Sequence, residues 1–140
     1  MGNRAEVHFV DREKHFSPGV YIHSFGHEVP KLLADAMHFF LRHDSEYCAA
    51  RFCGVTHDFL VAEECRPQYG LGLRPPLNDL VEATEKRAAR LDWGLVIVNV
   101  SDFSVERFGY AITKEIVLDP TTVKRWPGVK KKRRKKEETK

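Results

Sequence analysis

Apolar residues recur at helical spacing along two stretches of the chain. The first stripe consists of Val29, Leu32, Leu33, Ala36, Met37 and Phe40. This i, i+3, i+4, i+7 pattern is typical of one face of an amphipathic helix, and Pro30 suits a first helical turn. We therefore predict a helix over residues 30–43. The second stripe, which predicts a helix over 77–91, consists of Leu77, Leu80, Val81, Thr84, Ala88 and Leu91.

In other stretches, apolar and polar residues alternate, or all residues are apolar, and both patterns are typical of strands. Val7 and Phe9 alternate with charged neighbours, which indicates a short edge strand over residues 6–11. Residues 20–25 are rich in β-formers, and the apolar run 95–100 predicts a central strand with both faces covered. We further predict strands over 47–52 and 58–63 with a turn at Gly54, a loop over 65–76, and a strand or hairpin over 108–117.

The predicted order from residue 20 to residue 100 is β-α-β-β-α-β, which is the ferredoxin-like split βαβ order. Right-handed crossovers would place both helices on one face of an antiparallel sheet. The fold class predicted is thus α+β, with about six strands and with the opposite sheet face open. We expect one domain over residues 1–123.

Composition agrees with a globular chain. The 140 residues are 42% hydrophobic and 31% charged, which excludes a largely disordered or collagen-like chain. The longest aliphatic run, Leu95 to Val98, is far shorter than the roughly 20 residues that span a bilayer. We expect no membrane partner.

Charge is distributed unevenly. Residues 124–140 hold ten Lys or Arg against two Glu, a net charge of +8, whereas the other 123 residues hold thirteen basic against eighteen acidic side chains, a net charge of −5. We predict a disordered tail over 124–140 that contacts nucleic acid or a ribonucleoprotein through its phosphates. The alternatives are a nuclear import signal and a tail that only aids solubility. The contact residues of the tail would be Lys130, Lys131, Lys132, Arg133, Arg134, Lys135 and Lys136.

The three cysteines form no complete disulfide framework, and the N-terminus has no apolar signal region. These features indicate an intracellular protein, either cytoplasmic or, if the source is eukaryotic, nuclear. Cys48, Cys53, His57 and Cys65 are residue types that bind zinc, but their spacing matches no zinc motif. We therefore predict neither a metal nor a cofactor.

An aromatic cluster falls on one side of the strand predicted at 20–25. If Val20 and Ile22 face the helices, then Tyr21, His23 and Phe25 face the open side, with Phe59 as a further candidate. Rings on an open sheet face can stack unpaired bases. The alternatives are a second small core and a homodimer interface.

Three cationic side chains could bind an anion. His27 precedes the first predicted helix, whose N–H groups favour negative charge. Arg66 and Arg74 flank a loop with two glycines, although no phosphate-binding motif is present.

Together these features predict a non-enzymatic protein associated with nucleic acid or ribonucleoprotein, in which the tail supplies phosphate affinity. One alternative is a small phosphate-handling enzyme with His23, His27, Arg66 and Arg74 around a pocket at the helix N-termini. The other is a homodimerising interaction module.

Overall fold

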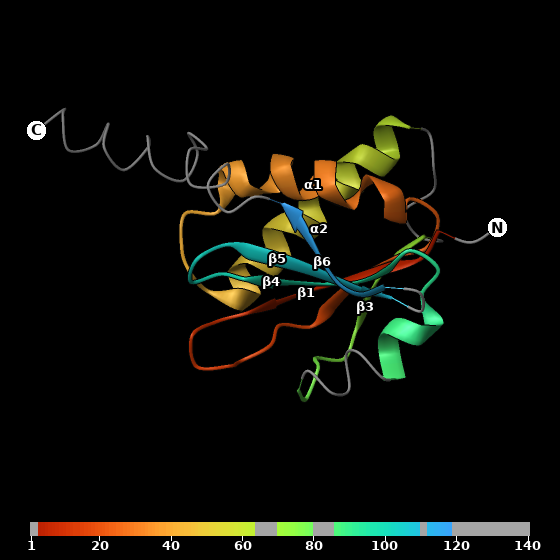
Figure 1. Ribbon diagram of the computed structural model, residues 1–140. Helices are drawn as coiled ribbons and strands as arrows, with labels where there is room; N and C mark the ends of the chain where they lie inside the picture. Colours follow the sequence, from red (N-terminus) through yellow and green to blue (C-terminus); the bar gives the residue numbers. More distant parts are fainter. Residues whose placement is uncertain (1–2, 64–69, 80–85, 110–111, 119–140) are drawn as a thin grey trace, which may run out of the picture.

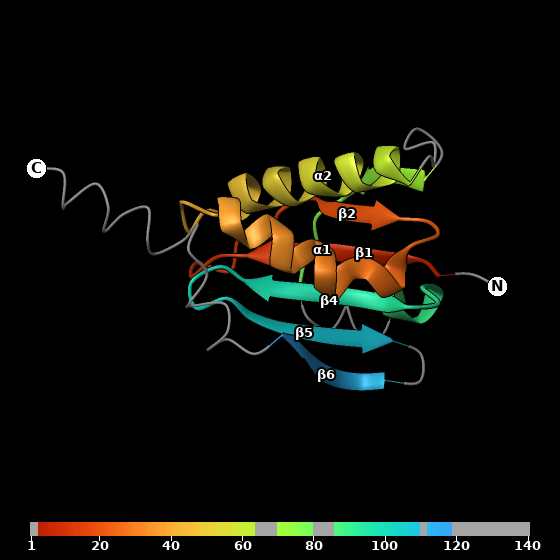
Figure 2. The same cartoon turned by 90° about the horizontal axis from the view of Figure 1, so that it is seen from above.

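Two parallel strands, β1 (Ala5–Val10) and β4 (Gly94–Asn99), lie at the centre of the sheet. The computed structural model describes residues 3–63, 70–79 and 86–109, and the backbone of 112–118. β1 pairs antiparallel with β2 (Gly19–Ile22), which pairs with β3 (Leu71–Arg74). On the other side, β4 pairs antiparallel with β5 (Ser104–Gly109), followed by β6 (Ile112–Leu118). The sheet is therefore mixed, in the order β3-β2-β1-β4-β5-β6. Figure 2 shows the strands from β2 to β6 side by side in this order.

Two helices cover one face of this sheet (Figure 1). They are α1 (Val29–Ala36), which is flanked by the 3-10 turns Gly26–Glu28 and Met37–Phe39, and α2 (Ser45–Ala62). Pro30 stands in the first turn of α1, and the apolar stripe of α1 is buried, as the sequence predicts. Among the described residues, no helix is long and apolar enough to cross a membrane.

Successive side chains of β1 point to opposite faces of the sheet, and each face carries its own cluster of buried residues. Ala5, Val7 and Phe9 face the helices and join the larger cluster of buried residues. The other side of the sheet carries a smaller cluster, called here the second core cluster, which consists of Val10, Leu77, Ala88, Leu91, Leu95, Ile97 and Phe108. The 3-10 turn Ala88–Arg90 lies on this side of the sheet (Figure 1). β4 is buried on both faces, which confirms the central strand expected from its apolar run.

The two strands expected at 47–52 and 58–63 are wrong, because these residues form the single helix α2. Asp44 caps the helix by accepting a hydrogen bond from the Tyr47 N–H at 3.0 Å. The buried side chains then follow a helical period: Ser45, Cys48, Ala49, Phe52, Thr56 and Leu60. Gly54 lies within the helix instead of in a turn. Aromatic and β-branched residues favour strands only weakly, and here the helical period decides.

The topology also differs from the prediction. β1 is a central strand instead of an edge strand, and its parallel pairing with β4 makes the sheet mixed instead of antiparallel. Both long helices follow β2 without a strand between them, so the β-α-β-β-α-β order is not observed. The predicted loop 65–76 contains β3. The helix expected over 77–91 lies partly outside the described residues, which show a bend near residue 78 and a helical turn over 86–90.

Substitutions at two glycines, one packed and one open, test the packing of β2 against β1. Gly19 lies against the fully buried His8 ring, and an added Cβ would overlap that ring. We expect Gly19→Ala to lower the free energy of unfolding by about 1–3 kcal/mol, as overpacking does. The matched control is Gly54→Ala, because its Cβ would meet no atom within 4 Å and alanine favours a helix; here we expect a gain of about 0.5–1 kcal/mol. Urea denaturation measures both. Equal effects of the two substitutions would contradict the assignment.

Candidate functional site

The parallel strands β1 and β4 end side by side, and the segments that follow them run in diverging directions; we call this place the fork. Val10 and Asn99 are partners in the parallel register, and the Val100 N–H donates to the Val10 carbonyl at 2.9 Å. After this point the chain turns from β1 back to β2, and from β4 back to β5, toward opposite edges of the sheet. Diverging connections at the carboxyl ends of adjacent parallel strands are where open α/β sheets form ligand crevices. A cavity of about 650 Å³ lies at this fork, and we call it the fork cavity.

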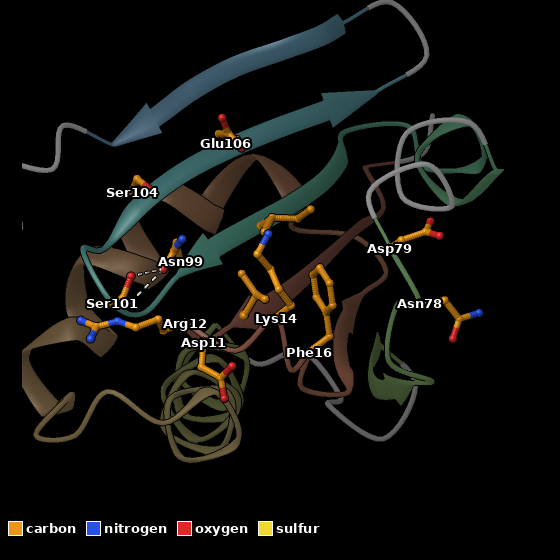
Figure 3. Close-up of a pocket in the computed structure, with 12 residues that line it drawn as sticks. Asp11, Arg12, Lys14, Phe16, Asn78, Asp79, Asn99, Ser101, Ser104 and Glu106 are labelled. Carbon is orange, nitrogen blue, oxygen red and sulfur yellow. Dashed lines mark hydrogen bonds between the residues drawn. The ribbon is translucent and has the colours of Figure 1, made fainter.

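The fork cavity is lined by polar and charged side chains and by a few apolar ones. Figure 3 shows Arg12 and Ser101 at one end and Asn78 and Asp79 at the other, with Lys14 and Phe16 between them. Ser104 and Glu106 line the wall formed by β5, and Val10 and Ile97 of the second core cluster contribute apolar surface. The cavity therefore lies on the side of the sheet opposite the helices.

The loop between β1 and β2 is held by Asp11. The carboxylate of Asp11 accepts the His15 N–H at 2.9 Å, and the Asp11 carbonyl accepts the Lys14 N–H at 3.0 Å. This tight turn places Lys14 in the left-handed region, with φ of 67°. Such a conformation is unusual for a residue other than glycine, and it fixes the position from which the Lys14 side chain enters the cavity.

Asn99 presents a defined group to the cavity. Its Oδ1 accepts hydrogen bonds from the Ser101 N–H at 3.0 Å and from the Ser101 hydroxyl at 2.6 Å. Because a backbone N–H can only donate, the atom that faces it must be the amide oxygen. The Asn99 amide nitrogen, a donor, is therefore directed away from Ser101.

A smaller hollow of about 440 Å³ lies at the same fork, toward the start of α2. It shares Asp11, Arg12 and Ser101 with the fork cavity and adds Glu13, His43 and Asp44. His43 Nδ1 lies 2.5 Å from the Val100 carbonyl, so that nitrogen must carry the proton. Nearby, a hydrogen bond to Glu46 raises the pKa of His15 above its usual value.

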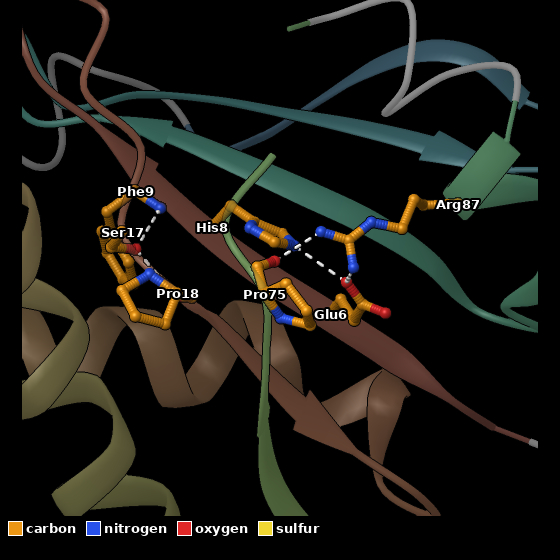
Figure 4. Close-up of polar contacts among 7 residues, drawn as sticks. All are labelled: Glu6, His8, Phe9, Ser17, Pro18, Pro75 and Arg87. Carbon is orange, nitrogen blue, oxygen red and sulfur yellow. Dashed lines mark hydrogen bonds and ion pairs between the residues drawn. The ribbon is translucent and has the colours of Figure 1, made fainter. Parts of the chain in front are cut away.

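On the same side of the sheet as the fork cavity, β1 carries a buried charged group. Glu6 Oε1 lies 2.8 Å from His8 Nε2 and 3.7 Å from Arg87 Nη1 (Figure 4). Arg87 Nη2 also donates to the Pro75 carbonyl at 2.5 Å. Glu6 and His8 share the face of β1 opposite the helices. Arg87 thus joins two covering segments, at residues 75 and 87, to the centre of the sheet.

The aromatic residues singled out from the sequence are separated by the fold. Tyr21, His23 and Arg74 come together: the Tyr21 hydroxyl lies 2.9 Å from His23 Nδ1, and the Arg74 guanidinium carbon lies 4.2 Å from the centre of the Tyr21 ring. We call these three residues the Tyr21 cluster. Phe25 instead packs on the helical side, with its ring 5.6 Å from that of Phe59 in α2.

The proposed anion site is not assembled as expected. His27 precedes α1, as predicted, but its ring contacts the Asn3 amide and lies 3.6 Å from a Glu28 carboxylate oxygen. No contact between described residues joins His27 to His23 or Arg74. Arg66 and the tail residues Lys130 to Lys136 lie outside the described residues.

Sequence reasoning missed the fork cavity. The charged run Asp11 to His15 and the polar residues at and just after the end of β4, Asn99 and Ser101, were a usable signal. Each set ends a strand, but only the parallel adjacency of β1 and β4 brings them together. That adjacency depends on residues about ninety positions apart and leaves no local pattern.

Within the described part of the chain, no three His, Cys, Asp or Glu side chains are grouped so that they could hold a metal ion. Cys48 is buried in α2, and its thiol donates to the Arg42 carbonyl at 3.4 Å. Burial raises the pKa of the Cys48 thiol to about 12 and also raises the pKa of Cys53.

The raised pKa predicts that Cys48 is unreactive in the folded protein, because the thiolate is the nucleophile. At pH 8, we expect iodoacetamide to leave Cys48 unmodified and to alkylate it once the chain is unfolded in urea. Peptide mapping by mass spectrometry reports each cysteine separately. Equal rates of modification at Cys48 with and without urea would contradict its burial.

The buried charged group predicts a large effect of Arg87→Met. This substitution leaves the buried Glu6 carboxylate without its arginine partner, and we expect the free energy of unfolding to fall by about 3 kcal/mol. The double variant Glu6→Gln/Arg87→Met should recover part of that loss, because the buried charge is also removed. Arg90→Met, at an exposed neighbouring position, is the control. Additive losses in the double variant would show that the two groups do not interact.

Comparisons of the chain with known protein families, with curated proteins and with solved structures found no match. The functional argument therefore rests on the described residues themselves. Two features carry it, the Tyr21 cluster at β2 and β3 and the fork cavity at the ends of β1 and β4.

Proposed function

We propose that the protein is a non-enzymatic nucleic-acid-binding protein. In this proposal the Tyr21 cluster contacts bases and the basic tail contacts phosphates. The observation that carries it is the stacking of the Arg74 guanidinium on the Tyr21 ring, 4.2 Å from its centre, beside a histidine. Single-stranded nucleic acids are bound by such combinations of rings and arginine planes.

The geometry of the Tyr21 cluster suits this role. Tyr21 is half-buried against the second core cluster, so its ring is anchored, whereas His23 and Arg74 are exposed. The guanidinium face that is turned away from Tyr21 offers a plane on which a base could stack, and its edges offer donors to phosphate. The ring therefore holds the arginine in one orientation.

The tail supplies a different contribution. The seven consecutive cations from Lys130 to Lys136 would release counterions from a phosphate backbone, which gives affinity without sequence preference. Such affinity falls steeply with salt, whereas stacking on the Tyr21 cluster does not depend on released ions. Salt dependence can therefore separate the two contributions.

Fluorescence anisotropy with a labelled mixed-sequence single-stranded RNA and a duplex DNA tests the proposal. We expect Arg74→Ala to weaken RNA binding about tenfold, since loss of one stacking contact costs about 1–3 kcal/mol. The matched control is Arg42→Ala, because Arg42 stacks on Tyr47 at a similar distance of 4.3 Å but belongs to the helical side of the molecule. Arg42→Ala should leave RNA binding unchanged.

In a second experiment, all seven lysines and arginines from Lys130 to Lys136 are replaced by glutamine in the full chain. We expect weaker binding to both RNA and DNA and a smaller slope of affinity against salt concentration. If Arg74→Ala and Arg42→Ala have the same effect, the Tyr21 cluster is not the base-contacting site. Absence of binding to either polymer at low salt would overturn the proposed function.

A further inference from the structure

The fork cavity holds a set of side chains that the proposed nucleic-acid contact does not use. We propose that it binds a single ribonucleotide, as a nucleoside monophosphate. The cavity volume of about 650 Å³ lies within the range of small-molecule sites. This inference does not rest on the proposed function, because the Tyr21 cluster contributes no residue to the cavity lining.

Charges of both signs line the cavity: Asp11, whose carboxylate accepts the His15 N–H, lies in the same loop as Arg12 and Lys14, and Asp79 lies at the far end. Arg12 and Lys14 come from the loop between β1 and β2, whereas Glu106 comes from β5 (Figure 3). Arginine and lysine are the side chains that bind phosphate, and a carboxylate accepts hydrogen bonds from ribose hydroxyls. A ligand that contacts both the cations and Glu106 has an anionic end and hydroxyl donors.

The middle of the cavity suits a base. Phe16 is half-buried, packs against the second core cluster and lines the cavity, so its ring is a supported apolar surface. Aromatic rings of this kind stack bases. The Asn99 amide nitrogen, which Ser101 orients through the opposite end of the amide, can donate to an acceptor on the base edge.

The backbone at Lys14 supplies an independent observation. Its φ of 67° is the conformation that glycine adopts at no steric cost, and that L-residues adopt at a cost. Strained residues of this kind cluster at functional sites. The loop thus retains a lysine where glycine would be more stable, and the lysine side chain lies in the cavity (Figure 3).

This conformation provides an unusually clean variant. Lys14→Gly removes the cation and relieves the backbone at the same time, so a loss of binding cannot be attributed to a loss of folding. Its thermal unfolding midpoint should equal or exceed that of the unmodified protein. The matched control is Lys31→Ala, because Lys31 is an exposed lysine on α1 that pairs with Asp35 at 3.5 Å.

Isothermal titration calorimetry of the full chain with AMP, GMP, CMP and UMP tests the proposal. We expect at least one nucleotide to bind with Kd below 1 mM and inorganic phosphate to bind at least tenfold more weakly. Lys14→Gly should weaken nucleotide binding at least tenfold, and Lys31→Ala should change it less than twofold. Arg74→Ala should also leave it unchanged, which separates this site from the proposed RNA contact.

A comparison of ribonucleotides with 2′-deoxyribonucleotides tests the contact between Glu106 and the ribose. We expect the 2′-deoxy form of the best ligand to bind about fivefold more weakly, and Glu106→Gln to reduce that preference. Failure of all four nucleotides to bind would overturn the proposal, as would binding that Lys14→Gly leaves intact. Inorganic phosphate binding as tightly as the nucleotides would also overturn it, since the base and sugar would then make no contact.

Discussion

Parallel pairing of β1 with β4 constrains the rest of this structure. Parallel strands cannot be joined by a tight turn, so the chain must leave β1, cross over and return to the same edge. Here the crossover runs from Val10 to Gly94 and includes β2, both long helices and β3. The two helices cover one face of the sheet, and the second face is left to shorter segments. Right-handed crossovers normally impose such an arrangement.

The pairing also creates the fork. Two strands that run in the same direction end at the same edge, and here each continues into a hairpin on its own side. The loops after Val10 and Asn99 therefore diverge, and the space between them is lined by side chains. Polar groups from both loops can converge there without disturbing the core, and this explains why Arg12, Lys14 and Asn99 lie around one cavity.

The second face is held by charge as well as by apolar contact. Glu6 and His8 occupy positions of β1 where apolar residues would be expected, and Arg87 completes the group from a covering segment. A buried ion pair is costly to desolvate and contributes little net stability, but it specifies its partner closely. It thereby links the segments at residues 75 and 87 to β1, on the side of the sheet that also carries the fork cavity. The Tyr21 cluster lies on the same face, where Tyr21 packs on the second core cluster.

The sequence by itself determined the features that depend on local period. The helical stripe beginning at Val29 and the buried strand β4 were predicted correctly, because side-chain spacing along one element decides them, although α1 ends at Ala36 and not at residue 43. Only the tertiary structure decided which strand lies beside which. β1 reads as an edge strand because Glu6 and His8 are polar, yet it pairs with both β2 and β4, and Arg87, eighty-one positions from Glu6, lies 3.7 Å from the Glu6 carboxylate. The same long-range adjacency brings Lys14 and Asn99 to one cavity, and no local pattern encodes it.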